Sequence, residues 1–377
     1  MVDAVQLDAG ERALLAACAA GDEGAATALL RAGTDPAQYA EETGASCLML
    51  AVAAGAESLC VLLLQAGAPW NALDRRGRCA GEYAIDGSHQ RIVDLIVNHA
   101  VQCELLLGAA GRNERLVPQK PPQQQGAPAA DAALPAAGES EQYLSRSVRY
   151  DGDRLLDEAN DAVMMEWERP LMEAHAQILC AEGRDRRVLN IGFGMGIIDG
   201  LIQQFGCATH TVIEAHPSVA AKARRDGWDE RVNLVEGRWQ DALGPGGAAR
   251  AHGPWDAIFY DAYAEDYSDM RELHSMLPEL LVPGGIYSFF NGLCPDNIFF
   301  HGVICQLVQE QLELADLGLA CEFMPVAIEV AESEWEGVTR KYWHGRDTYY
   351  LPVALLQPAE QEEGEGAVAE EAAPSPE

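Results

Sequence analysis

The chain has 377 residues, which is enough for two domains, and its apolar fraction of 48% is ordinary for a globular protein. Its charge is not ordinary, because 59 acidic residues against 26 basic ones give a formal net charge of −33. Nucleic-acid phosphates are bound through basic faces, so this composition argues against direct nucleic-acid binding. A field of this sign attracts cationic partners; the alternative is that the charge only maintains solubility.

Neither a membrane span nor a secretion signal is recognisable in the sequence. No uninterrupted apolar run approaches the ~18 residues of a span, and Asp3, Asp8 and Glu11 stand where a signal peptide would carry basic residues. The ten cysteines are scattered, without a C-x-x-C pair or the Cys/His spacing of a zinc site. We therefore expect a soluble protein of the cytoplasm and nucleus with reduced thiols, no metal and no membrane contact.

Residues 1–117 are rich in Ala and Leu and repeat themselves. Arg31-Ala32-Gly33 recurs 34 positions later as Gln65-Ala66-Gly67, and helical patterns fill each unit. A period near 33 residues, with two short helices and a turn ending in glycine, resembles ankyrin repeats. Two units are clear, and the flanking ones are degenerate, as terminal repeats tend to be. Such repeats usually form protein-binding surfaces; a small helical bundle is the alternative.

Three further segments follow the repeats. Residues 118–140 are rich in Pro, Gln and Ala, which is linker composition. Residues 141–357 alternate helical and strand patterns, which predicts an α/β sheet domain. Residues 358–377 hold seven Glu and no basic residue, which predicts a disordered acidic tail.

A glycine-rich turn follows the first buried-strand pattern of the α/β domain. The strand pattern 187–191 leads into Gly192-Phe193-Gly194-Met195-Gly196 and then into a helical segment. Glycines here let the backbone approach a ligand at the N-terminal end of a helix. The next strand pattern ends at Glu214, whose carboxylate can accept both hydroxyls of an adenosine ribose. These two features suit either a nicotinamide dinucleotide or a methyl donor.

Residues further along the chain separate these two cofactors. Trp239 and Gln240 follow the third strand pattern and can flank an adenine, and Asp261 follows the fourth. A Pro-Gly-Gly turn at 283–285 leads into the fifth strand, as is frequent in class I methyltransferases. The dinucleotide fingerprint would also require a glycine where Ile197 stands. An NAD enzyme is therefore disfavoured, and the expected fold is a class I Rossmann-like methyltransferase: a mostly parallel seven-stranded sheet with helices on both faces.

Several strings carry a more specific resemblance. Those at 164–172, 192–197, 260–261 and 349–353 resemble guanidinoacetate N-methyltransferase. With the repeats in front, the chain more closely resembles the type IV protein arginine methyltransferases, the arginine N-methyltransferase 2 family of fungi and plants. The strings that favour this second family are Val163-Met164-Met165, Glu214-Ala215-His216-Pro217, Gly237-Arg238-Trp239-Gln240 and Lys341-Tyr342-Trp343.

The resemblance implies a site for S-adenosylmethionine without a metal. According to this resemblance, the residues of the site close over the donor, cradle its methionyl part, contact its ribose and adenine, or lie beside the reacting centre. These residues are Tyr143, Met164, Met172, Phe193, Gly194, Met195, Gly196, Ile197, Ile198, Glu214, Ala215, His216, Trp239, Gln240 and Asp261. Tyr150 is an alternative to Tyr143. Methionines at helical spacing are also common core residues.

The acceptor chemistry requires acidic residues. A guanidinium is a poor nucleophile that must be oriented toward the methyl group and must lose a proton, and it pairs best with carboxylates. We expect Glu168 and Asp261 to be the catalytic pair, with Glu166 as the alternative to Glu168. Arg169 stands where guanidinoacetate N-methyltransferase carries a threonine, which would change the mouth of the acceptor site.

The resemblance implies that the protein methylates the δ nitrogen of an arginine in a basic protein, and it suggests a ribosomal protein as the substrate. The chain lacks the Thr-His-Trp string of the ω-methylating enzymes. Two alternatives remain open at this point. One is a small-molecule guanidino methyltransferase with an unrelated repeat domain, and the other is an ankyrin adaptor whose methyltransferase domain is inert.

Overall fold

The computed structural model describes residues 7–109, 139–181, 185–265, 267–294, 297–314, 317–343 and 347–358. The predicted linker (118–140, apart from its last two residues) and the predicted tail (358–377, apart from its first residue) lie outside the described residues. Within the described ranges, none of the helices is both long enough and apolar enough to cross a membrane.

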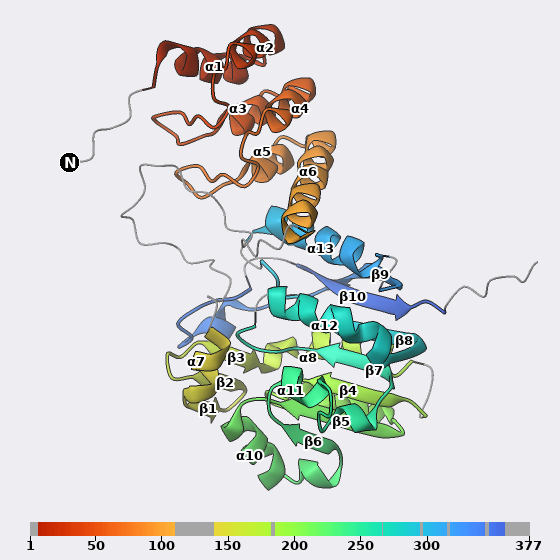
Figure 1. Cartoon of the computed structure of the whole chain (residues 1–377). Helices are drawn as coiled ribbons and strands as arrows, with labels where there is room; N and C mark the ends of the chain where they lie inside the picture. Colours follow the sequence, from red (N-terminus) through yellow and green to blue (C-terminus); the bar gives the residue numbers. More distant parts are fainter. Residues whose placement is uncertain are drawn as a thin grey trace, which may run out of the picture.

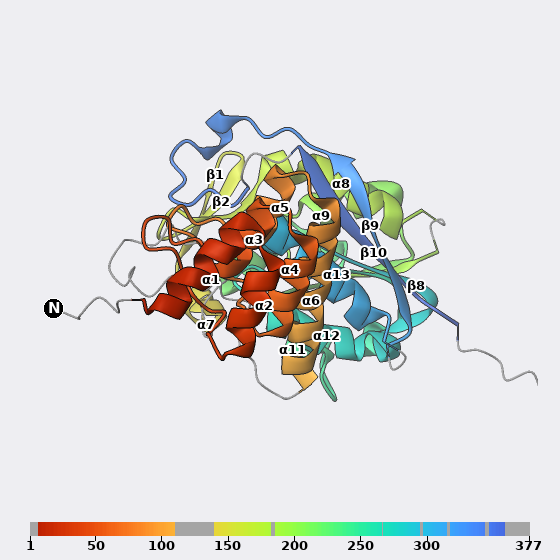
Figure 2. The same cartoon turned by 90° about the horizontal axis from the view of Figure 1, so that it is seen from above.

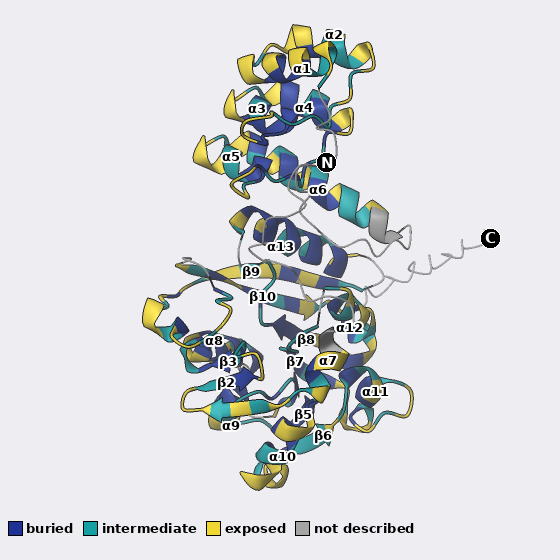
Figure 3. Cartoon of the chain, turned by 90° about the vertical axis from the view of Figure 1, so that its left-hand side faces the viewer, coloured by how far each residue is buried: buried dark blue, intermediate teal, exposed yellow. Residues whose placement is uncertain are grey.

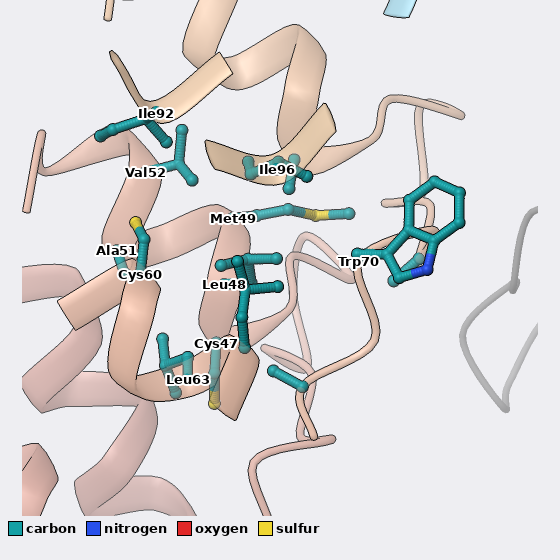
Figure 4. Packing of buried hydrophobic residues seen from close by; sticks show 14 of the residues in the cluster. Cys47, Leu48, Met49, Ala51, Val52, Cys60, Leu63, Trp70, Ile92 and Ile96 are labelled. Atoms are coloured by element: carbon teal, nitrogen blue, oxygen red, sulfur yellow. The ribbon is translucent and has the colours of Figure 1, made fainter. Parts of the chain in front are cut away.

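The N-terminal part consists of stacked helix pairs, as the repeat pattern predicted (Figure 1). Their bounds are α1 (Ala9–Ala20), α2 (Glu23–Arg31), α3 (Cys47–Ala53), α4 (Glu57–Gln65), α5 (Ala80–Asp86) and α6 (Gln90–Ala109). Asp8 and Ser46 cap α1 and α3 by accepting hydrogen bonds from backbone N–H groups in the first turn. Leu48 and Met49 of α3 are fully buried against the neighbouring repeats (Figure 4). The stack therefore has one continuous core.

Helix α13 (Ile298–Leu312) joins the repeats to the α/β domain. It lies between α6 and the strands β9 and β10 and is buried along most of its length (Figures 1 and 3). Phe299 and Phe300 belong to the same hydrophobic cluster as the repeats, and the Phe300 ring packs edge-on against Trp70 at 5.9 Å between centroids. Gln306 Nε2 donates to Asn98 Oδ1 at 3.0 Å. The two domains thus share a core.

Gly81 of α5 packs directly against the Phe299 ring in this shared core, which gives a testable prediction. A Cβ at Gly81 would lie 1.9 Å from the Phe299 ring. Gly81→Ala is therefore expected to lower the free energy of unfolding by about 1–3 kcal/mol, the usual effect of overpacking. Gly24→Ala is the matched control, because Gly24 is an exposed helical glycine whose added Cβ would meet only Asp22 Oδ1, at an ordinary contact distance of 3.5 Å, and alanine normally stabilises a helix there. Denaturant unfolding of both variants checks the prediction, and equal stability of Gly81→Ala and wild type would contradict it.

The α/β domain is built on a seven-stranded sheet in the order β6-β5-β4-β7-β8-β10-β9. The strands β4 to β8 run parallel, and β10 lies antiparallel between β8 and β9. Their bounds are β4 (Arg187–Ile191), β5 (Thr209–Glu214), β6 (Asn233–Glu236), β7 (Trp255–Tyr260), β8 (Leu281–Phe289), β9 (Leu319–Ala327) and β10 (Thr348–Leu356). The predicted class I methyltransferase fold is confirmed.

Helices cover both faces of the sheet, and a separate hydrophobic cluster fills each side. The covering helices are α8 (Arg169–Leu179), α9 (Ile197–Phe205), α10 (Pro217–Arg225), α11 (Trp239–Leu243), α12 (Tyr267–Leu280) and α13, with the short 3-10 helices η2 (Trp228–Glu230) and η3 (Arg250–His252) between them. Open α/β sheets bind ligands at the carboxyl ends of their parallel strands. That edge is therefore where the site is sought.

A small second layer lies over this edge. It consists of α7 (Glu139–Ser145), the antiparallel sheet β1 (Val148–Asp151), β2 (Arg154–Asp157) and β3 (Ala162–Met165), and the 3-10 helix η1 (Glu166–Glu168). Tyr150 Oη donates to the carbonyl of Gly194 at 2.9 Å, which ties β1 to the glycine-rich turn. Figures 1 and 2 show α7 and β1–β3 on the side of the molecule toward which the hairpin loops of the repeats also project.

Candidate active site

The glycine-rich turn connects β4 to α9. Gly192, Gly194 and Gly196 have φ angles of 96°, 53° and 71°, a backbone conformation that residues with a Cβ rarely adopt. At Gly192 the reason is also steric, because a Cβ would lie 2.0 Å from the backbone carbonyl oxygen of Asp261. Asn190 holds the turn from below, since its Nδ2 donates to the Gly192 carbonyl at 2.8 Å and to Asp199 Oδ1 at 2.9 Å.

Glu214, at the end of β5, accepts hydrogen bonds from the backbone of the turn. Its Oε2 accepts from the backbone N–H of Phe193 at 2.8 Å and more weakly from that of Gly194 at 3.4 Å, and its Oε1 accepts from the N–H of His216 at 2.6 Å. Burial raises the pKa of this carboxyl, and the three backbone donors oppose the shift. Because each carboxylate oxygen has two lone pairs and three of the four are used, Oε1 keeps capacity to accept from one ribose hydroxyl.

A pocket opens in front of the turn. It is lined by residues from α7, β3, the turn and the ends of β5, β6 and β7: Tyr143, Leu144, Val163, Met164, Ile191, Gly192, Gly194, Ile213, Glu214, Ala215, Gly237, Arg238, Trp239, Asp261, Ala262, Tyr263 and Glu265. The Tyr143 ring packs against Tyr263 and His216, with centroids 4.8 and 4.9 Å apart. Glycines that admit close backbone approach, a ribose-binding carboxylate and an indole for adenine fit S-adenosylmethionine.

Glu265 is a lining residue that sequence reasoning missed. Its Oε2 accepts from Trp239 Nε1 at 2.7 Å and from the Tyr260 hydroxyl, and its Oε1 accepts from Gln240 Nε2 at 3.4 Å. Gln240 therefore points at Glu265 and does not itself line the pocket. Burial raises the pKa of Glu265, and the donors from Tyr260 and Trp239 oppose this. Its position four residues beyond Asp261 was the signal available in the sequence.

The predicted donor residues divide into two groups. Tyr143, Met164, Gly194, Glu214, Ala215, Trp239 and Asp261 line the pocket. Tyr150, the alternative to Tyr143, instead binds the Gly194 carbonyl.

The other predicted donor residues do not line the pocket. Met172, Ile197 and Ile198 are buried in the cluster beneath the sheet, because α8 and α9 turn these faces toward the core. The Phe193 ring packs edge-on against Trp228, so this residue contributes its backbone N–H. The residues placed behind the lining are Met172, Phe193, Met195, Gly196, Ile197, Ile198, His216 and Gln240.

Glu168 and Asp261, the predicted acidic pair, lie within electrostatic reach of each other. Asp261 lines the pocket, whereas Glu168 is only 3% exposed and is not among the lining residues. Burial and the charge of Asp261 raise the pKa of Glu168 to about 8, and burial and Glu214 raise that of Asp261 to about 7. The Glu166 side chain is 40% exposed and pairs with Arg169 at the surface, which gives it a surface role. A cation beside two carboxyls of raised pKa would stabilise the ionised form of both.

Among the described residues, no group of three or more His, Cys, Asp and Glu side chains is arranged to hold a metal ion.

Comparison with known proteins follows the same division of the chain. A family profile described as guanidinoacetate N-methyltransferase matches residues 139–296, and an ankyrin-repeat profile matches residues 43–75. The chain is 36% identical over 321 residues to a protein arginine N-methyltransferase 2 of Aspergillus fumigatus, covering 76% of this chain and 74% of the relative. It is 32% identical over 311 residues to the protein of that name from Saccharomyces cerevisiae, with coverage of 76% and 74%. The chain therefore belongs to the protein arginine N-methyltransferase 2 family.

Proposed function

We propose that this protein transfers the methyl group of S-adenosylmethionine to the δ nitrogen of an arginine side chain in a protein substrate. The observation that carries the proposal is the pair of carboxyls formed by the buried Glu168 and the half-buried Asp261, of which Asp261 lines a pocket with donor-binding features. Family membership supports arginine as the acceptor. The choice of the δ nitrogen rests on the resemblance to the type IV enzymes.

The acidic pair binds and activates the acceptor. Both pKa values are raised because the carboxylates are desolvated, and a guanidinium placed between them supplies the missing positive charge. Binding therefore favours ionisation of both acids and fixes the planar group by charge-assisted hydrogen bonds. As the new N–C bond forms, the bond between the donor's methyl carbon and its sulfonium sulfur breaks. The nitrogen's proton then passes to a carboxylate, for which Asp261 is placed at the pocket.

The repeats provide a place to hold a protein substrate. Their hairpin loops carry the bridges Tyr39↔Ser46 and Leu73↔Cys79 and lie on the same side of the molecule as α7 and β1–β3 (Figures 1 and 2). The shared core at α13 keeps these loops at a constant position relative to the site. The net charge of −33 favours a basic partner. We infer a basic, arginine-bearing substrate such as a ribosomal protein, and we propose the cytoplasm and nucleus as the location of the enzyme.

Transfer of labelled methyl groups tests the proposal. The enzyme is incubated with labelled donor and, separately, with a ribosomal protein fraction and with guanidinoacetate. Mass spectrometry is then expected to find the methyl group on an arginine δ nitrogen in a protein. Label in guanidinoacetate alone would establish the small-molecule activity instead. Calorimetry that finds no donor binding would indicate an adaptor with an inert methyltransferase domain.

A further inference from the structure

The connection between β9 and β10 is much longer than a hairpin needs. Ala327 pairs with Thr348, so residues 328–347 join two adjacent antiparallel strands that a turn of two to five residues could connect. Long ordered connections of this kind commonly carry function. The described part, residues 328–343, is here called the 328–343 segment and contains the 3-10 helix η4 (Glu332–Trp335).

The 328–343 segment is packed and not a solvated loop. Trp335 and Trp343 are buried in a hydrophobic cluster with Met165 and Leu171, on either side of η1. Trp167 in η1 contacts three aromatic rings of the segment, with ring centroids at 5.8 Å for Trp335, 5.6 Å for Tyr342 and 6.1 Å for Trp343. The segment therefore holds the short helix that carries Glu168.

Polar contacts anchor the same segment to the β1–β3 sheet. Arg154 Nη1 donates to the carbonyl of Glu336 at 2.6 Å. The Thr339 hydroxyl donates to the carbonyl of Ala159 at 2.7 Å, and its backbone N–H donates to that of Asn160 at 3.0 Å. These contacts leave Tyr342, near the end of the segment, in a defined position.

Tyr342 reaches the carboxyl that we propose binds the acceptor. Its hydroxyl donates to Glu168 Oε1 at 2.5 Å, and the backbone N–H of Met165 donates to the same oxygen at 2.8 Å. Burial and the neighbouring Glu168 raise the pKa of Tyr342 well above its ordinary value, so the phenol stays protonated and acts as the donor. The two donors occupy both lone pairs of Oε1, which leaves Oε2 as the oxygen that can bind an acceptor.

We propose that Tyr342 is a positioning residue for methyl transfer, which holds Glu168 through Oε1 so that Oε2 faces the acceptor guanidinium. The inference rests on the proposed function, because it takes the guanidinium as the acceptor. The groups that act on Glu168 come from several elements: Asp261 after β7 raises its pKa, whereas Tyr342 and the Met165 N–H lower it. Tyr349 of β10 also lies within electrostatic reach of Glu168. The 328–343 segment thus supplies the side chain that fixes one oxygen of Glu168.

Tyr342→Phe removes the hydroxyl and keeps the ring packing. Loss of a hydrogen bond to a charged group is expected to lower acceptor kcat/KM about ten- to hundredfold. Donor affinity should be unchanged, and the acid limb of the pH profile should move to higher pH. Tyr350→Phe is the matched control, since Tyr350 is partly exposed on β10 and should behave as wild type. On a Glu168→Gln background, Tyr342→Phe should change kcat/KM less than about twofold, because the two residues act together.

A measurement without turnover separates this inference from the proposed function. An infrared pH titration of buried carboxyls, in which Glu168→Gln identifies the Glu168 band, should show a higher midpoint in Tyr342→Phe than in wild type. An unchanged midpoint would overturn the inference, as would equal effects of Tyr342→Phe with and without Glu168. A wild-type enzyme that methylates no arginine would refute the proposed function, while the infrared titration would still decide the role of Tyr342.

Discussion

Glu168→Gln is expected to lower kcat/KM for an arginine acceptor by about 10²- to 10³-fold, the usual effect of removing one preorganised polar group from a reacting centre. Gln is nearly isosteric, and its carbonyl oxygen can still accept from Tyr342 and the Met165 N–H, so the fold should survive. Donor affinity by calorimetry should match that of wild type. Glu166→Gln is the matched control, because Glu166 lies two residues away and faces solvent.

The raised pKa values of Asp261 and Glu168 predict that both activity and stability depend on pH. Because Asp261 and Glu168 have raised pKa values of about 7 and about 8, wild-type kcat/KM should rise as pH increases through this range. Stability should respond in the opposite direction. Glu168 binds its proton more tightly in the folded state than in the unfolded chain, where its pKa is near 4.5, so its burial increasingly destabilises the fold as pH rises from there to 8.

Glu168→Gln removes that dependence, so the variant should be at least as stable as wild type at pH 9 and should lose less stability between pH 6 and pH 9. Thermal unfolding at both pH values provides the measurement. A variant with wild-type turnover would exclude Glu168 from the acceptor site, and an unchanged pH dependence of stability would show that its carboxyl is not the one that titrates.

Gly192→Ala is expected to weaken donor binding more than tenfold and to destabilise the protein by roughly 1–3 kcal/mol. The residue has a φ of 96°, and an added Cβ would lie 2.0 Å from the Asp261 carbonyl oxygen. Since that neighbour is backbone, it cannot move aside without displacing Asp261, and acceptor turnover should fall as well.

Gly200→Ala serves as the control for this substitution, because Gly200 lies within α9 and an added Cβ there meets no atom within 4 Å. Calorimetric titration with the donor and denaturant unfolding compare the two variants. Wild-type donor affinity in Gly192→Ala would show that the turn does not have to approach Asp261 this closely.

Features set by adjacent residues could be predicted from the sequence. The glycine turn, Glu214 and Asp261 each follow directly from the end of a buried strand, and parallel strands bring such ends to one edge. The order of helices and strands, and the repeat period, are also local patterns.

Features that depend on packing between distant segments could not be predicted from the sequence. Which face α8 and α9 turn toward the sheet decided that Met172 and Ile197 belong to the core. Tyr342 is 174 positions from the carboxyl it binds, so no local spacing could connect them. The second sheet β1–β3 and the burial of α13 beneath the repeats likewise arise only when separate parts of the chain meet.

The position of α13 limits how the two halves of the protein can be separated. A chain shortened to remove α1–α6 would leave the Phe299 and Phe300 side chains facing water, and exposed aromatic surface of this kind promotes self-association. If such a truncated protein lost activity, the cause could be either its self-association or the loss of substrate recognition. Substitutions in the hairpin loops, which leave the α13 contact intact, can distinguish the two causes.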